Sequence, residues 1–418
     1  MAQRLPESSS FLKPDDESQS GAVTDVTPSC DDNHAEDYQL SAYDYDLPES
    51  YIAQNPAVPR DSSKLLVIDA PNSHHHTHFR DLASWLRPND LLILNNTRVI
   101  PARLFGRKQI AKDNHPRSEQ LGAAVEVLLI EPVSADRWLA LVKPGRRLQP
   151  GTTIVFTDSF PGETVSTESP SGKPPIMTAL IESRDDSTNG RILQLRSGTG
   201  DALSAEAIND LIHRLGQVPL PPYITQSESL PEQYQTVFAQ RQGAIAAPTA
   251  GLHFTEGLFA ALAQKGIETA EVTLHVGIGT FRPVEVDDIE THQMHQERIE
   301  VSEETVEKIR CAKAKGGRVI SVGTTSTRAL EGVAAACGEL RAYTGKTEIF
   351  IYPGYQWQVI DGLITNFHLP GSSLLMMVSA LMGRQRLMAI YEDAIARNYR
   401  FYSFGDAMLI LPAAAVKA

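Results

Sequence analysis

Short apolar runs bounded by turn residues alternate with amphipathic stretches in two separate parts of the chain. In the first part, residues 64–69 and 90–95 predict buried strands, and residues 79–86 predict an amphipathic helix that ends before Pro88. After residue 220, strands are predicted over 244–247, 271–276, 318–322, 348–352 and 362–365, and helices over 255–265, 302–316, 326–337, 372–382 and 384–398. Such alternation is typical of an α/β domain.

The segment between these two parts has a different pattern. Short strands are predicted over 124–130, 138–142, 152–156, 177–182 and 191–196, with a helical period only over 201–215. Turns rich in Gly, Pro, Ser and Asp separate them, which favours a small β-barrel or sandwich. We therefore predict a discontinuous α/β domain with a mixed sheet, over 41–99 and 221–418, and a β-barrel domain inserted at 100–220.

The N-terminal segment, residues 1–40, is rich in Ser, Asp and Glu and lacks a periodic apolar pattern, which predicts a disordered acidic leader. Residues 1–50 carry 12 acidic and 2 basic side chains, so most of the net charge of −13 lies there. The rest of the chain is nearly neutral and allows locally basic surfaces, such as one around Arg98 and Arg103. Net charge therefore does not exclude a nucleic-acid partner.

Three cysteines at unrelated spacings, among 418 residues, form neither a disulfide framework nor a zinc-binding pattern. No apolar run approaches the ~20 residues that span a bilayer, and the N-terminus lacks the basic and apolar regions of a signal peptide. We expect a cytoplasmic protein without a membrane partner.

Two glycine-containing segments follow predicted strands. Gly277-Ile-Gly279 resembles the start of a dinucleotide fingerprint, but no helix is predicted after it, so a Rossmann site is rejected in favour of a tight turn or a close approach to a flat ligand. Gly323-Thr-Thr-Ser-Thr-Arg328 opens a predicted helix whose free N–H groups could bind an anion, a carboxylate or ribose hydroxyls. The alternative is that these threonines only cap the helix.

Several histidines are candidates for metal ligands or general bases. The run at 74–78 is interpreted as a solvated loop, and the pair at 292 and 295 lacks the spacing of a zinc protease, so no metal site is predicted. His253 and His368 follow predicted strands and could act as a general base near neutral pH, or serve as hydrogen-bonded structural residues.

Together, these segments and several other blocks of the sequence resemble the family of S-adenosylmethionine:tRNA ribosyltransferase-isomerases of queuosine biosynthesis. Resembling blocks run in the family's order over 45–49, 95–106, 219–224, 234–237, 246–254, 272–277, 279–281, 292–297, 323–328, 349–354, 365–370 and 402–408. The sequence departs from the family pattern in its acidic leader, its long barrel loops and Arg241-Gln-Gly243, none of which removes a candidate catalytic residue.

The resemblance implies a six-stranded inserted barrel and a specific reaction. The ribosyl part of S-adenosylmethionine is transferred to 7-aminomethyl-7-deazaguanine at the wobble position of a tRNA and isomerised, giving epoxyqueuosine, adenine and methionine. A base must remove a C5′ hydrogen that the sulfonium acidifies, and the attacking amine must be neutral. S-adenosylmethionine is then a co-substrate, no permanently bound cofactor is expected, and the chain is expected to be a monomer.

Site residues are assigned from the matching blocks. His253 or His275 is the expected base, with Asp406 as a third choice. Phe254, Phe281 or Phe367 could stack on the exposed wobble base, and Arg98, Arg103 and Arg328 are candidates for phosphate or carboxylate contacts. The remaining expected substrate-binding residues are Asn95, Asn96, Thr97, Thr249, Gly251, Gly277, Gly279, Thr280, Gly323, Thr324, Thr325, Asn366 and His368.

Two rivals come from other classes. A non-catalytic RNA-binding protein predicts erosion of the pocket blocks, which are intact here. An ordinary methyltransferase requires a glycine-rich loop after an early strand, and that loop is absent from the sequence.

Overall fold

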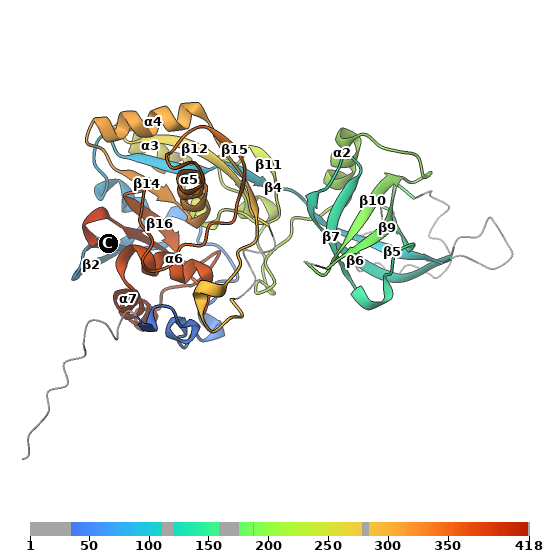
Figure 1. Cartoon of the computed structure of the whole chain (residues 1–418), viewed down its shortest axis with the longest axis horizontal. Coiled ribbons are helices and arrows are strands. Elements are labelled where there is room, and N and C mark those ends of the chain that lie inside the picture. Colours follow the sequence, from blue (N-terminus) through green and yellow to red (C-terminus); the bar gives the residue numbers. More distant parts are fainter. Residues whose placement is uncertain (1–34, 111–119, 159–174, 187, 278–283, 417–418) are drawn as a thin grey trace, which may run out of the picture.

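The computed structural model describes residues 35–110, 120–158, 175–186, 188–277 and 284–416. These residues form a helix-covered sheet and a closed barrel that lies to one side of it (Figure 1). The predicted fold class, an α/β domain with a mixed sheet and an inserted six-stranded barrel, is confirmed.

The described part of the α/β domain is built on a nine-stranded sheet. Its strands, from one edge to the other, are β15 (Tyr343–Thr347), β13 (Glu297–Val301), β12 (Glu268–His275), β3 (Leu91–Asn95), β14 (Val319–Val322), β16 (Gly362–Asn366), β17 (Ala407–Ile410), β1 (Lys64–Ala70) and β2 (Ser73–His78). The four central strands β12, β3, β14 and β16 are parallel, whereas β17 is antiparallel to β16. The carboxyl ends of four parallel strands and the start of β17 therefore meet at one end of the sheet.

Helices cover both faces of this sheet. The α-helices of the described chain are α2 (Ala205–Leu215), α3 (Glu256–Gln264), α4 (Glu303–Ala314), α5 (Thr324–Cys337), α6 (Ser373–Met382) and α7 (Arg384–Ala396). Leu91 and Ile93 of β3 pack in one core with α4 and α5, while Leu92 and Leu94 face the other core with α3. Successive residues of a strand point to opposite faces, so β3 can be apolar throughout.

The barrel closes in the order β10 (Gly190–Ser197), β7 (Arg137–Lys143), β6 (Gln120–Pro132), β5 (Arg103–Ile110), β8 (Thr153–Phe156) and β9 (Met177–Asp185). Alternate apolar residues of these strands, with Ile208 and Ile212 of α2, fill its core. Two short paired strands, β4 (Thr97–Val99) and β11 (Arg241–Ala244), lie where the chain leaves and re-enters the α/β domain.

Short 3-10 helices connect the larger elements. They are η1 (Leu40–Tyr43), η2 (Glu49–Tyr51), η3 (Arg60–Ser62), η4 (Phe79–Ser84), η5 (Gly145–Arg147), η7 (Pro231–Tyr234), η8 (Thr249–His253), η10 (Ile289–Thr291) and η11 (Pro412–Ala414). Among the described residues, no helix has the length and apolar character to cross a membrane.

Several local predictions were wrong. Residues 348–352 form no strand, because Ile349 and Ile351 pack against the α6 core from a connecting segment. The 79–86 helix is the short 3-10 helix η4, and the strand predicted at 244–247 is β11, three residues earlier. The histidine run at 74–78 lies in strand β2 and is therefore not a loop. Strands β5 and β13 were not predicted, since polar residues interrupt their apolar positions, and the apolar strand β17 was also not predicted.

The first described residues, from residue 35 on, also differ in detail from the predicted leader. Glu36 and Asp37 form ion pairs with Arg384 of α7, and Tyr38 and Leu40 pack against the α6–α7 core. The leader's residues 1–34 lie outside the described residues.

Candidate active site

A hollow of about 50 Å³, which we call the threonine pocket, lies where the carboxyl ends of the parallel strands meet. Open α/β sheets commonly bind ligands at this end of their strands. The pocket is lined by Ala247, Pro248, Thr249, Ala250, Val276, Gly323, Thr324, Thr325, Thr365, Asn366, His368, Leu374, Tyr402 and Ser403.

The N-terminus of α5 forms one wall of the threonine pocket. Gly323 precedes the helix with a φ of +88°, a conformation that favours glycine, and Thr324 and Thr325 form the first turn. The free N–H groups of a helix N-terminus carry a partial positive charge that attracts anions and lone pairs. The expected helix after β14 is confirmed.

Asn95 holds Thr325 in place. Its Nδ2 donates to Thr325 Oγ1 at 3.1 Å and to the Leu274 carbonyl at 3.0 Å, while its Oδ1 accepts from the Leu274 amide at 3.0 Å. Because the Thr325 oxygen accepts from Asn95, the hydroxyl proton is left for another acceptor. Asn95 therefore acts on the pocket through Thr325.

Asn366 also lines the threonine pocket. Its Nδ2 donates to the Tyr402 carbonyl at 2.9 Å and lies 3.3 Å from His253 Nε2. Its Oδ1 is buried and has no hydrogen-bond partner among the described residues. A buried acceptor without a partner is costly, so a ligand that donates a hydrogen bond here would satisfy it.

His368 also lines the pocket, with Nε2 at 2.9 Å from Thr365 Oγ1. Burial lowers the pKa of His368 to about 3. The imidazole is therefore neutral at physiological pH, and a hydroxyl neighbour fixes its orientation.

A larger cavity of about 780 Å³, which we call the inter-domain cleft, lies between the barrel and the α/β domain. The barrel contributes Ile130, Glu131, Pro132, Val133, Leu139 and Thr188; the α/β side contributes Gln242, Gly243, His275, Val276, Gly277, His295, Gln296, Glu297, Arg298, Thr344, Gly345 and Lys346. Val276 lines both this cleft and the threonine pocket, so the two cavities adjoin after β12.

His275 ends β12 and is half-buried in the cleft. Its Nδ1 lies 2.8 Å from Thr97 Oγ1, which is within 3.4 Å of the Arg241 carbonyl. Gly243 packs on the ring with a φ of +146°, and a Cβ at this position would lie 2.8–3.0 Å from the imidazole atoms. If Nδ1–H donates to Thr97 and Thr97 donates to the carbonyl, Nε2 is left as a proton acceptor.

Burial and the neighbouring Arg298 charge lower the pKa of His275, and Glu300 opposes them. The side chain is thus a neutral imidazole near pH 7. His275, Arg298 and Lys346 are partners in register on β12, β13 and β15, so three basic residues form one row beside the cleft. We call these three residues the basic row.

His253, by contrast, is enclosed in the protein. It is 1% exposed, its Nδ1 lies 2.7 Å from Ser63 Oγ, and its ring stacks on Phe79 with centroids 4.9 Å apart. Burial, followed by Arg60 and Arg400, lowers its pKa well below the usual range. His253 reaches the threonine pocket through Asn366.

Asp406 is a structural anchor by its contacts. Its carboxylate accepts from the backbone amides of Lys64 and Arg400 at 2.9 and 2.8 Å, and from the Arg400 guanidinium at 3.2 Å. It is 1% exposed and does not line either cavity.

Other sequence-predicted residues lie away from both cavities. Phe254 and Phe367 are fully enclosed in core clusters, so neither presents a ring face for a base. Gly251 packs against Phe238, Arg328 is buried in an ion pair with Glu297, and Arg103 pairs with Glu126 on the barrel. These positions were predicted from blocks of sequence, which do not indicate the direction of a side chain.

Asn96 and Arg98 line neither the threonine pocket nor the inter-domain cleft. Asn96 bonds Glu271 and Thr273 on the outer side of β12, and Arg98 is exposed on β4, paired in register with the cleft residue Gln242. Gly279, Thr280 and Phe281 lie outside the described residues.

The sequence assignment missed Tyr402, Ser403, Arg298 and Lys346. Tyr402 and Ser403 begin one of the resembling blocks, but only the positive φ of Tyr402, 71°, turns this backbone into the pocket wall. Arg298 and Lys346 occupy exposed positions in short alternating strands. The alternation of apolar and polar positions along these strands was the one sequence pattern that could have indicated Arg298 and Lys346.

The fold and site define an α/β protein with a barrel insertion and a pocket at the strand ends, joined to an inter-domain cleft. The family model described as "Queuosine biosynthesis protein" matches residues 40–410. The chain belongs to this family.

Two relatives with similar sequences agree with this assignment. The chain is 56% identical over 382 residues to the S-adenosylmethionine:tRNA ribosyltransferase-isomerase of Acaryochloris marina, covering 91% of this chain and 95% of that protein. It is 54% identical over 396 residues to the protein of the same name from Trichormus variabilis, covering 90% and 93%. The crystal structure of S-adenosylmethionine tRNA ribosyltransferase from Thermotoga maritima is 34% identical, covers 88% of this chain and 100% of that chain, and has a TM-score of 0.47.

Proposed function

We propose that this protein is an S-adenosylmethionine-dependent tRNA ribosyltransferase-isomerase. It transfers the ribosyl moiety of S-adenosylmethionine to 7-aminomethyl-7-deazaguanine at the tRNA wobble position and isomerises it, giving epoxyqueuosine-tRNA, adenine and methionine. The observation that carries the proposal is the junction of two cavities at Val276. There the threonine pocket, which contains the N-terminus of α5, adjoins the inter-domain cleft, which contains the neutral His275. A donor and a nucleotide can thus meet there.

We assign the donor to the threonine pocket and its junction with the cleft. The N-terminus of α5 and the Thr324 and Thr325 hydroxyls suit the donor's carboxylate or ribose hydroxyls. The Asn366 Oδ1 suits an N–H donor, such as the adenine amino group. The threonine pocket, at about 50 Å³, has room for only a part of the donor. The rest of the donor extends past Val276 into the inter-domain cleft.

We assign the tRNA anticodon to the inter-domain cleft. Its volume of about 780 Å³ admits a nucleotide extruded from a single-stranded loop. Arg298 and Lys346 of the basic row are exposed and suit backbone phosphates.

His275 is our choice for the base that removes the C5′ hydrogen. It lines the cleft next to Val276, its Thr97 contact orients the ring, and its lowered pKa keeps Nε2 free. His253 and Asp406 are assigned positioning roles, because their polar atoms are occupied by protein groups.

Several finer features stay predictions. These are a cytoplasmic location, a monomeric state, the absence of a permanently bound cofactor, and the division into a leader, a discontinuous α/β domain and a barrel domain at 100–220. S-adenosylmethionine is consumed as a co-substrate in this proposal.

The direct test is incubation with S-adenosylmethionine and a tRNA that carries the aminomethyl-deazaguanine wobble base. Adenine released in step with epoxyqueuosine is the expected result, and the same tRNA with an unmodified guanine serves as the control. Methylated tRNA with S-adenosylhomocysteine, or tRNA binding without turnover, would overturn the proposal in favour of a methyltransferase or a binding protein.

The assignment of the base is tested by deuterium incorporation at C5′ of the donor in heavy water. His275→Ala should reduce incorporation by about 100-fold or more, since a positioned base contributes 10²–10⁴-fold. His78→Ala, at an exposed position on β2, is the matched control and should leave the rate unchanged. Unchanged incorporation in His275→Ala would remove this residue from the role.

A further inference from the structure

The histidine run at 74–78 lies in strand β2, although a loop was expected there. The strand fixes the side of the sheet to which each histidine points. β2 pairs antiparallel with β1, with His74 opposite Ile68, His75 opposite Val67 and His76 opposite Leu66. Leu66 and Ile68 face the core with α6 and α7, whereas Val67 faces the opposite core. His74 and His76 therefore share the α7 side of the sheet.

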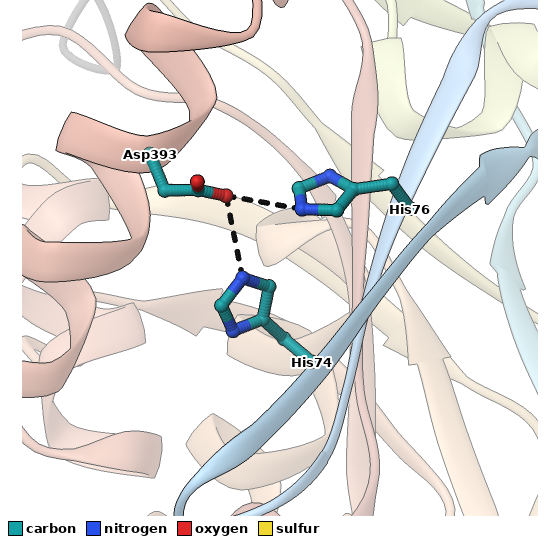
Figure 2. A group of neighbouring side chains, drawn as sticks. All are labelled: His74, His76 and Asp393. Atoms are coloured by element: carbon teal, nitrogen blue, oxygen red, sulfur yellow. Dashed lines mark hydrogen bonds and ion pairs between the residues drawn. The ribbon is translucent and has the colours of Figure 1, made fainter. Parts of the chain in front are cut away.

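These two imidazoles converge on a single carboxylate. His74 Nε2 and His76 Nε2 lie 3.3 and 3.0 Å from the same oxygen, Oδ2 of Asp393 on α7, as Figure 2 shows. One potential ligand atom from each of the three residues lies within 4.8 Å of the others. The ground for excluding a metal here, the absence of fixed geometry in a loop, no longer applies.

The distances fit a tetrahedral metal site. Zinc bonds of about 2.0–2.1 Å at tetrahedral angles place neighbouring ligand atoms roughly 3.3 Å apart. Both nitrogen-to-oxygen distances are already close to this value. The three side chains are 27–29% exposed, so the imidazoles can rotate to close the remaining nitrogen-to-nitrogen distance, and water can enter as the fourth ligand.

Neighbouring groups hold these ligands in orientation. The other oxygen of Asp393, Oδ1, accepts from Arg397 Nε at 2.9 Å, which leaves Oδ2 directed at the imidazoles. His76 Nδ1 lies 2.8 Å from the hydroxyl of Tyr399, a buried side chain. A partner on the distal nitrogen of a ligating histidine is the usual arrangement around bound metal ions.

We propose that His74, His76 and Asp393 bind one zinc ion, which connects the edge strand β2 to helix α7. Two imidazoles and a carboxylate form a donor set that suits zinc and similar divalent transition metals. The site shares no residue with the threonine pocket or the inter-domain cleft. Its role is structural, because the ion would hold an edge strand to the helix that covers it.

His75 supplies a matched control on the same strand. It points to the opposite side of the sheet, where its Nε2 lies 3.1 Å from Asp69 and its ring packs against Trp85. A variant of His75 removes one imidazole of the same run without touching the proposed ligands. It therefore separates a defined site from general affinity of a histidine-rich strand.

The experiment uses the full chain without a polyhistidine tag, stripped of metal by a chelator and titrated with zinc chloride in a calorimeter. We expect one equivalent to bind, with at least about tenfold weaker affinity in His76→Gln and unchanged affinity in His75→Gln. Zinc should raise the melting temperature of the wild type and of His75→Gln, because a ligand that binds only the folded state stabilises it.

Folding of the variants is checked by their melting temperatures without metal, and His74→Gln or Asp393→Asn replaces any variant that is unfolded. Cobalt in place of zinc should give the visible absorption of a tetrahedral site in the wild type and in His75→Gln only. The proposal is overturned if less than one equivalent binds, or if the His75 and His76 variants lose affinity equally. It is also overturned if neither loses affinity.

Discussion

His275 illustrates how its immediate surroundings set the chemistry of a residue. The imidazole touches Thr97 on one side and Gly243 on its face, and its pKa is lowered by burial and by Arg298. The imidazole can accept a proton only in its neutral form. Since the pKa of His275 is lowered from the usual 6.5, activity should be lost only as the pH falls below that value. His253, with the same side chain, is enclosed by Ser63, Asn366 and Phe79 and lacks this access.

The first prediction concerns this acidic limb. Arg298→Gln removes a positive charge that disfavours the imidazolium form, so the pKa of His275 should rise and the limb should move to higher pH. Glu300→Gln removes an opposing negative charge and should move the limb to lower pH. The measurement is kcat against pH at saturating concentrations of both substrates. Shifts in the same direction for the two variants would exclude His275 as the titrating base.

The second prediction concerns Asn366. Its Oδ1 has no partner among the described residues, and its Nδ2 is held by Tyr402. Asn366→Ala should therefore weaken S-adenosylmethionine binding about 5- to 150-fold, the range for one lost hydrogen bond of about 1–3 kcal/mol. Isothermal titration with the donor alone measures this. Asn398→Ala, on a surface turn away from the pocket, is the control and should bind normally. Equal affinity in Asn366→Ala would remove the residue from the donor site.

Helix α5 is the element on which the threonine pocket depends. Its N-terminus forms a pocket wall, and its buried Glu331 accepts from the backbone amides of Gln358, Val359 and Ile360, each at 3.0 Å. Tyr355 donates to the same carboxylate at 3.0 Å, and burial followed by this negative charge raises the pKa of Tyr355. Glu331 thus fastens the 355–360 segment to α5 and fixes the position of the helix.

The third prediction follows from this anchor. Glu331→Gln replaces a charged acceptor of four hydrogen bonds with a group that has one acceptor oxygen, so the free energy of unfolding should fall by about 3 kcal/mol. Urea denaturation followed by circular dichroism measures the loss. Glu304→Gln on α4, whose side chain is 76% exposed and forms an ion pair with Lys308, should change it by less than about 1 kcal/mol. Similar values for the two variants would show that the anchor contributes little.

In the whole molecule the barrel lies to one side of the α/β domain (Figure 1). Residues of both domains line the inter-domain cleft. The basic row crosses three strands at one side of this cleft, although the chain as a whole carries a net charge of −13. Binding of tRNA should therefore depend on a local surface and should weaken with salt.

The fourth prediction is made at this scale. Lys346→Gln should weaken tRNA binding and reduce the slope of log affinity against log salt by about 0.7, the value for one lost contact to a single strand. Lys313→Gln on the exposed side of α4 removes an equal charge outside the cleft and should leave the slope unchanged. The measurement is fluorescence anisotropy of labelled tRNA at several salt concentrations. Equal slopes for the two variants would place the tRNA elsewhere.

The sequence by itself determined the family, the fold class and most elements. Apolar runs such as Leu91–Asn95 predict strands, and Gly323 indicates a turn before a helix. Both could be predicted because strand formation and a positive φ depend on a few neighbouring residues. The blocks around Gly323 and Asn366 likewise indicated residues that the fold brings into one pocket.

Only the tertiary structure decided which side chains face a cavity. Arg328 and Phe367 lie in resembling blocks but are buried, whereas Arg298 and Lys346 meet across strands that are far apart in sequence. His74 and His76 reach Asp393 only because β2 lies beside α7. Contacts of this kind depend on how distant segments pair and pack, which no local pattern of residues specifies.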